Sequence, residues 1–156
     1  MIALGIDPGS RRIGYGVVAK KKDNALYFVA AGILKIESSD DTIALAETKK
    51  GIAAVIKKYK PDVMGIEKLY FAKNQKTAMA VAQARGVLML TAHEAGLPIK
   101  EYAPNEIKLG IAGYGFADKK AILKMVRLIL GKQDLKIIDD ASDALAGAIM
   151  AVNDRY

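Results

Sequence analysis

The sequence predicts an α/β fold in which a mixed five-stranded sheet is flanked by helices. Three strand-like stretches follow one another at the start of the chain, a pattern that favours antiparallel pairing. Strand-like and helical stretches then alternate, which is typical of parallel strands joined by helical crossovers. The chain has 156 residues, of which 52% are hydrophobic, so we expect one domain over residues 1–156 with a substantial core.

The first half of the chain predicts three strands, a helix and a fourth strand. The run Ile2–Ile6 is apolar without a break, as in a fully buried strand, and a polar turn at 20–24 divides the next two apolar stretches. A helical pattern then ends at Pro61. Its apolar face consists of Leu45, Ile52, Ile56 and Tyr59. The predicted strands are 2–7, 13–20, 25–36 and 62–67, and the predicted helix is 41–59.

The second half predicts a further strand and four helices. Gly96 ends an alanine-rich helical pattern, Pro104 can open a short helix, and Asp118 can cap another of about 13 residues. Three glycines predict a flexible loop before that capped helix, namely Gly110, Gly113 and Gly115. The remaining predicted elements are a helix at 75–95, a strand at 98–102 and a last helix from about 139 to 153.

The charge distribution indicates an anionic partner. The net charge is +7, and the stretch 68–93 contains no acidic residue. Residues 100–136 carry eight Lys or Arg against four Asp or Glu. Solubility alone is the other explanation of this charge. A basic surface with a few isolated carboxylates is typical of an enzyme that cuts or modifies nucleic acid.

The composition also restricts the possible metal sites and compartments. There is no cysteine and only one histidine, so carboxylates must hold any metal, which favours Mg²⁺ or Mn²⁺. No apolar run approaches the ~18 residues of a membrane span, and the chain does not start like a signal peptide. We therefore expect a cytoplasmic protein that does not enter a membrane.

Three separated segments each bring carboxylates to the end of an element. Asp7 ends a buried strand and Pro8 keeps it extended, although an Asp-Pro-Gly turn explains this stretch equally well. Glu67 ends a second apolar run, where the alternative is an ion pair with Lys68 or another lysine. Burying such charges is costly unless a cation compensates them.

The third segment is DDASDALAGA, residues 139–148. Asp140 and Asp143 are three residues apart and share a face of the predicted helix, although first-turn acids also suit a helix start. Small residues around them, including Gly147, would let this helix lie close to the sheet. If the three segments converge, their carboxylates can bind two metal ions about 4 Å apart, an arrangement suited to phosphodiester hydrolysis.

Three motifs carry a resemblance to a known family. They are GIDPGSRRIGYGVV, IEKLYFAKNQKTAMAVAQARGV and DDASDALAGAI. Together they resemble the RuvC family of Holliday junction resolvases, the crossover junction endodeoxyribonucleases, from Ile2 to about Val152. The resemblance implies a ribonuclease-H-like fold, a homodimer, and Mg²⁺-dependent paired nicking of four-way DNA junctions in homologous recombination and DNA repair. It also implies a branch-migration helicase complex as a partner.

The resemblance assigns roles to individual residues. The family's catalytic and metal-binding carboxylates correspond to Asp7, Glu67, Asp140 and Asp143, with two Mg²⁺ ions for which Mn²⁺ may substitute. The matching DNA-binding positions are Tyr70, where the family often has phenylalanine, Lys108 and Lys119. Asp139 precedes the matched position, where we expect it to cap the helix. The small-residue helix 77–92 is the candidate dimer interface.

Two other functions remain open from the sequence. The loop DPGSRRIG also resembles the phosphate loop of the sugar kinase, actin and heat-shock ATPase superfamily, but a second such loop is absent and the chain is short for those proteins. Another ribonuclease-H-like nuclease, or a non-catalytic junction-binding protein, is the second alternative. The presence of all four carboxylates argues against a non-catalytic protein.

Overall fold

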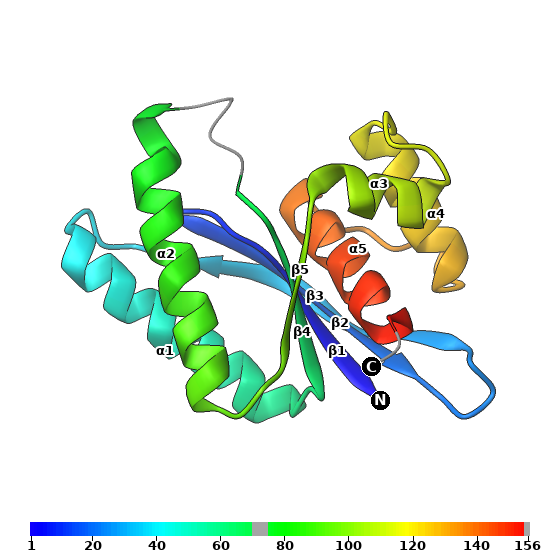
Figure 1. The fold of residues 1–156 in the computed structure, drawn as a ribbon, viewed down its shortest axis with the longest axis horizontal. Coiled ribbons are helices and arrows are strands. Elements are labelled where there is room, and N and C mark those ends of the chain that lie inside the picture. Colours follow the sequence, from blue (N-terminus) through cyan, green and yellow to red (C-terminus); the bar gives the residue numbers. More distant parts are fainter. Residues whose placement is uncertain (70–74, 155–156) are drawn as a thin grey trace.

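A five-stranded sheet with the order β3-β2-β1-β4-β5 lies at the centre of the molecule (Figure 1). The computed structural model describes residues 1–69 and 75–154. The strands are β1 (Ile2–Asp7), β2 (Arg12–Lys20), β3 (Leu26–Lys35), β4 (Val63–Glu67) and β5 (Ile99–Tyr102). β1, β2 and β3 pair antiparallel, whereas β4 lies parallel to both β1 and β5. The predicted mixed sheet is confirmed.

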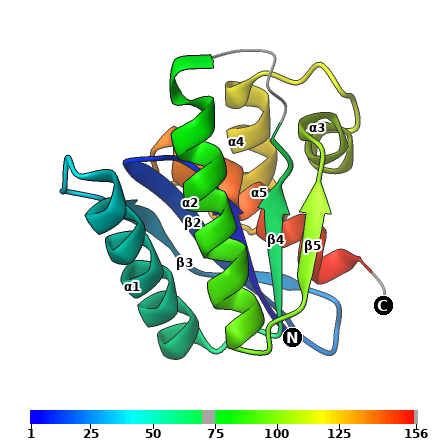
Figure 2. The ribbon, with the colours of Figure 1, turned by 60° about the vertical axis from the view of Figure 1, so that its left-hand side comes forward.

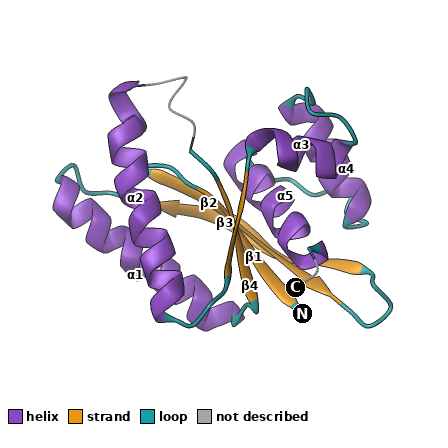
Figure 3. Cartoon of the chain, in the orientation of Figure 1, coloured by secondary structure: helices purple, strands orange, loops and turns teal. Residues whose placement is uncertain are grey.

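Helices cover both faces of the sheet (Figures 2 and 3). They are α1 (Asp41–Tyr59), α2 (Gln75–Glu94), α3 (Pro104–Ala112), α4 (Lys119–Ile129) and α5 (Asp139–Asn153). One apolar cluster joins the sheet to α1 and α2, and a second joins the opposite face to α3, α4 and α5. Among the described residues, no helix is both long and apolar enough to cross a membrane.

A row of glycines lets α5 lie directly on the sheet. Gly5 on β1 is the register neighbour of Gly16 on β2 and of Gly65 on β4. A Cβ atom on Gly16 would come within 2.7 Å of the Leu145 nitrogen, and one on Gly65 within 2.6 Å of the Gly147 oxygen. Only glycine permits this approach, so the expected close seating of the last helix is confirmed.

The buried face of α1 differs in part from the prediction. Its buried residues are Ala44, Thr48, Ile52 and Val55. Leu45, Ile56 and Tyr59 are only half-buried beside this stripe. α1 packs against both β3 and α2, so its smaller side chains take the closest positions.

The predicted glycine loop is shorter than expected. Gly110 lies inside α3, with Met150 of α5 directly beside it, and therefore does not belong to a loop. α3 ends at Gly113, whose φ of 82° lies in the left-handed region that glycine adopts without strain. Asp118 caps α4 as predicted, by accepting a hydrogen bond from the Ala121 N–H.

Candidate active site

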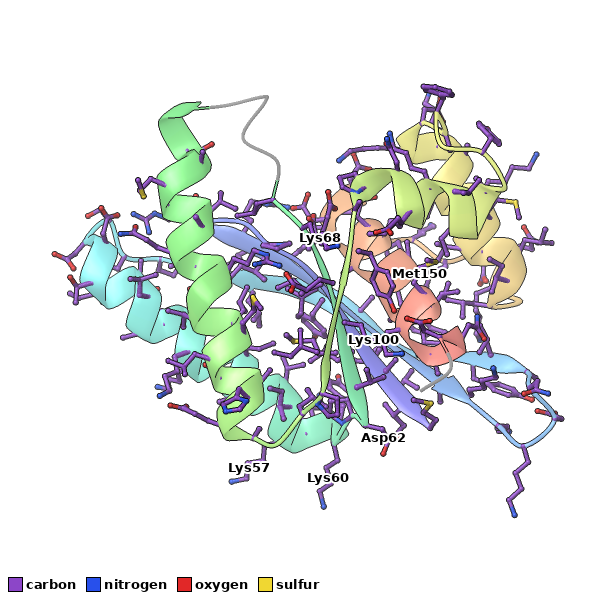
Figure 4. The ribbon with its side chains drawn as sticks, in the orientation of Figure 1. Lys57, Lys60, Asp62, Lys68, Lys100 and Met150 are labelled. Atoms are coloured by element: carbon purple, nitrogen blue, oxygen red, sulfur yellow. The ribbon has the colours of Figure 1, made fainter. Side chains whose placement is uncertain are left out.

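Two of the predicted carboxylates end neighbouring parallel strands. Asp7 is the last residue of β1 and Glu67 the last of β4, and the register pairs Ile6 with Ile66 directly before them. Because the carboxyl ends of parallel strands meet at one edge of a sheet, both side chains lie at the same edge. Figure 4 shows Lys68, which follows β4, at the opposite end of that strand from Asp62.

The start of α5 adds the other two carboxylates. Gly14 on β2 is the register partner of Asp7, and the backbone and Cβ of Asp140 lie directly against Gly14. The first turn of α5 is therefore placed beside Asp7. Asp143 follows on the same helix, and it lines a cleft of about 430 Å³ together with Glu67.

The electrostatics of Asp7 show the influence of the other three carboxylates. Its pKa is raised from 3.8 to about 8. Burial is the largest cause, and the negative charges of Asp143, Glu67 and Asp140 add to it. Lys119 opposes the shift. The edge thus concentrates more negative charge than the protein itself neutralises.

The same two influences act on the neighbouring carboxylates. Burial raises the pKa of Glu67, the charge of Asp143 raises it further, and Lys108 and Lys119 oppose the rise. Burial also raises the pKa of Asp143, against the effect of Lys119. For Lys119, burial acts to lower the pKa, but Asp143 and its neighbouring acids raise it.

Two cationic side chains lie against the carboxylates. Lys119 Nζ is 3.4 Å from Asp143 Oδ2 and 3.9 Å from Asp139 Oδ2. Arg12 Nε donates a hydrogen bond to Asp140 Oδ2 over 3.4 Å. Sequence reasoning missed Arg12, although it stands in the GSRRIG loop directly after the Asp-Pro-Gly turn.

The donor set suits a hard divalent cation. Within residues 1–69 and 75–154, no group of three or more histidine or acidic side chains is already arranged around a metal position. The residues nevertheless fit Mg²⁺ chemically, because all four acids offer oxygen ligands. Burial raises the pKa of Asp7, Glu67 and Asp143, and a cation would stabilise their negative charge. Lys119 and Arg12 provide part of that compensation in this structure.

The two predicted lysines lie at the candidate site, whereas Asp139 does not take its expected role. Lys108 and Lys119 line the cleft with Glu67 and Asp143, which brings the predicted basic positions to the carboxylates. Tyr70 lies outside the described residues. Asp139 does not cap α5: the N-cap position is Ile138, and Asp139 lies exposed in the first helical turn. An acid in this turn favours the helix dipole without a capping bond.

Within the described part of the chain, Glu67 forms no ion pair with a lysine, which was the alternative explanation of this residue. The backbone carbonyl of Glu67 accepts a hydrogen bond of 3.0 Å from Arg85 Nε on α2. Arg85 also pairs with Glu101 on β5. Sequence reasoning missed this link, because only the tertiary structure brings α2 to the end of β4.

A larger groove of about 720 Å³ lies beside β3 and the start of α5. It is lined by Lys35, Arg127 and Lys136 but contains none of the four carboxylates. We take the smaller cleft as the candidate active site, because Glu67, Asp143 and the two predicted lysines line it.

Comparisons with known proteins agree with this geometry. The family model of the crossover junction endodeoxyribonuclease RuvC matches residues 3–151. The RuvC of Moorella thermoacetica is 42% identical over 149 residues, which cover 96% of this chain and 89% of that protein. The RuvC of Chloroflexus aggregans is 43% identical over 150 residues, covering 96% and 91%.

A solved structure shows the same fold. The Thermus thermophilus RuvC in complex with a Holliday junction substrate is 30% identical, with a TM-score of 0.87 over 96% of this chain and 91% of that chain. This match identifies the fold as ribonuclease-H-like, as the sequence motifs imply. The chain belongs to the RuvC family of crossover junction endodeoxyribonucleases.

Proposed function

We propose that this protein resolves four-way DNA junctions by hydrolysing phosphodiester bonds at the cleft that holds Glu67 and Asp143. The observation that carries the proposal is the meeting of four carboxylates from β1, β4 and α5 in a RuvC-family chain. These four acids would hold Mg²⁺, which when bound supplies an activated water and charge stabilisation for the leaving oxygen.

The chain's own residues position the substrate in this mechanism. Lys108 and Lys119 line the cleft and give it positive charge that suits a DNA phosphate. The row of glycines under α5 holds Asp140 and Asp143 against the strand ends. Arg12 reaches Asp140 from β2, so it can orient that carboxylate or turn toward an incoming phosphate.

Paired cuts require two such sites in a fixed relation, and a homodimer would provide them. The outward stripe of α2 supports this part of the proposal. Met79, Gly86 and Leu90 follow a helical spacing, and the two large side chains are 70% and 53% exposed. A Cβ added at Gly86 would meet no atom within 4 Å outside its own helix, which leaves room for close approach. Ala84 does not belong to this stripe, because it is buried against its own chain.

Family membership supports the wider setting. We expect the protein to act in homologous recombination and DNA repair in the cytoplasm, with a branch-migration helicase complex as partner. The family model spans 3–151, which supports one nuclease domain over 1–156.

The test is cleavage of a synthetic four-way junction, with duplex, flap and RNA–DNA hybrid substrates as controls. We expect symmetric nicks in the junction with Mg²⁺ and none with chelator. Preferred cutting of the hybrid would indicate another ribonuclease-H-like nuclease. Junction binding without cutting under Mg²⁺ or Mn²⁺ would indicate a binding protein and overturn the proposed activity.

A further inference from the structure

Two exposed aromatic side chains stand at the tip of the loop between α3 and α4. Phe116 is 96% exposed and Tyr114 is 51% exposed. Single exposed apolar residues are common on protein surfaces, but two aromatic rings within three residues form a local patch. Neither ring takes part in an aromatic or cation–π contact within the described residues. The fold therefore does not use the almost fully exposed Phe116 ring for its own packing.

The loop is fixed at both ends. The N–H of Gly113 donates a 2.9 Å hydrogen bond to the Leu109 carbonyl and closes α3. Ala117 is only 1% exposed, and Asp118 caps α4 through a 2.7 Å hydrogen bond. Because Ala117 points inward directly after it, Phe116 is held outward. The ring is thus presented to solvent on a short, anchored loop.

The loop lies at the rim of the active-site cleft. Ala117, Asp118 and Lys119 line the same cleft as Glu67 and Asp143. DNA that binds at the carboxylates and extends over this rim would pass close to the aromatic tip.

The charges around the tip favour nucleic acid over an apolar protein partner. Lys119 and Lys120 are exposed and follow the tip after Ala117 and Asp118, and Lys108 lines the cleft from α3. Aromatic rings beside cations are the usual composition of a single-strand contact, since the cations hold phosphates while the rings stack on bases.

We propose that Phe116, assisted by Tyr114, stacks on an unpaired or unstacked nucleobase next to the branch point of the bound junction. The proposal rests on the proposed function and adds a positioning contact to it. Bases inside a continuous duplex offer no free face, whereas a branch point exposes base faces. The contact would favour branched over linear DNA, and it involves a different segment of the sequence from the one that contains Tyr70.

The chain contains no tryptophan, so one tryptophan can report this contact directly. We would compare Phe116→Trp with the control Leu128→Trp, which replaces a 58% exposed residue on α4. Both would be titrated with four-way junction in chelator. We expect quenching and a blue shift at position 116 only. Unchanged emission at position 116 in a saturated junction complex would overturn the proposal.

Affinity provides the second measurement. We expect Phe116→Ala to weaken junction binding about tenfold and duplex binding much less, because stacking on one base is lost. Phe116→Tyr should restore binding, whereas Phe116→Leu should not, since the contact needs an aromatic face. Leu128→Ala is the matched control with unchanged affinity. The midpoint of thermal unfolding of Phe116→Ala should equal that of the wild type, because the ring makes no internal contact.

Two results would overturn the inference. One is equal junction affinity of Phe116→Ala and wild type. If the tryptophan emission of Phe116→Trp then changes only with a protein from the recombination machinery, the tip is a protein-binding surface. The other is equal loss of affinity for duplex and junction, which would indicate a general DNA contact. In either case, junction cleavage by the wild-type protein would leave the proposed function intact, whereas its absence would refute that function independently.

Discussion

Burial and three neighbouring carboxylates all raise the pKa of Asp7, so a cation beside it would stabilise its negative charge. We expect Asp7→Asn, Glu67→Gln and Asp143→Asn each to abolish nearly all junction cleavage, because each removes a proposed metal ligand. Junction binding should persist or tighten, since negative charge near the DNA is lost. Parallel cleavage and gel-shift measurements would check this. Normal cleavage by any of the three variants would remove that residue from the site.

The raised pKa of Asp7 also predicts a pH dependence of stability in metal-free protein. Between its unfolded value of 3.8 and its folded value of about 8, the folded state holds a proton that the unfolded state has released. The contribution of Asp7 to the free energy of unfolding therefore falls as the pH rises through that window. Asp7→Asn lacks this effect. Its free energy of unfolding, measured in urea, should therefore exceed that of the wild type by an amount that grows from pH 5 to pH 8. A constant difference in chelator would contradict the assignment.

The adjacent residues Asp139 and Asp140 differ in their expected roles, since only Asp140 is a proposed metal ligand. Asp139 is exposed and makes no capping hydrogen bond, whereas Asp140 lies against Gly14 beside Asp7. We expect Asp139→Ala to retain most cleavage activity and Asp140→Ala to lose nearly all of it. Single-turnover rates at saturating Mg²⁺ would compare them. Equal rates would show that the register of α5 differs from the one proposed.

At the scale of elements, the seating of α5 on the glycines of β1, β2 and β4 decides where two of the four acids lie. A Cβ at Gly65 would meet the backbone of Gly147, which cannot yield without moving the helix. We expect Gly65→Ala to cost about 1–3 kcal/mol in the free energy of unfolding and to lower cleavage disproportionately. Gly115→Ala is the control for stability alone, because a Cβ at that position would meet no atom within 4 Å. Equal stability of the two variants would argue against this packing.

The elements themselves were largely predictable because their signals are local. Pro104 at the start of α3, Asp118 as the cap of α4 and the left-handed Gly96 all act through neighbouring backbone. The strand-end positions of Asp7 and Glu67, which made them candidate site residues, were also predictable, since an acid at the end of a buried strand is visible in sequence.

Other features depend on segments far apart in the chain. Gly110 is a residue type common in loops, yet it lies inside α3, directly beside the side chain of Met150. The bonds from Arg12 to Asp140 and from Arg85 to Glu67 span 128 and 18 residues. No pattern in one segment indicates such partners. The same holds for Ala84, which is buried although Ala82 and Gly86, two residues to either side, are half-buried and exposed.

At the scale of the whole molecule, α2 connects the proposed dimer interface to the active site. Its outer face carries Met79, Gly86 and Leu90, while Arg85 on the same helix donates to the Glu67 carbonyl and pairs with Glu101. A partner packed on the outer face would therefore fix the helix that braces the end of β4. We therefore expect this arrangement to couple assembly of the proposed dimer to the position of the Glu67 carboxylate.

The coupling gives a prediction for paired cleavage. Leu90→Lys places a charge at a 53% exposed position of the outer face, so it should weaken the dimer without unfolding the protomer. Leu109→Lys, at a 58% exposed position on α3, is the matched control. We expect sedimentation to show a dimer for the wild type and the control but a monomer for Leu90→Lys. In a cruciform plasmid assay, the monomer should give nicked circles by single cuts, whereas the dimer should give linear product. A wild-type monomer that linearises the plasmid in one binding event would refute the dimer, because one cleft cannot reach two symmetric phosphates at once.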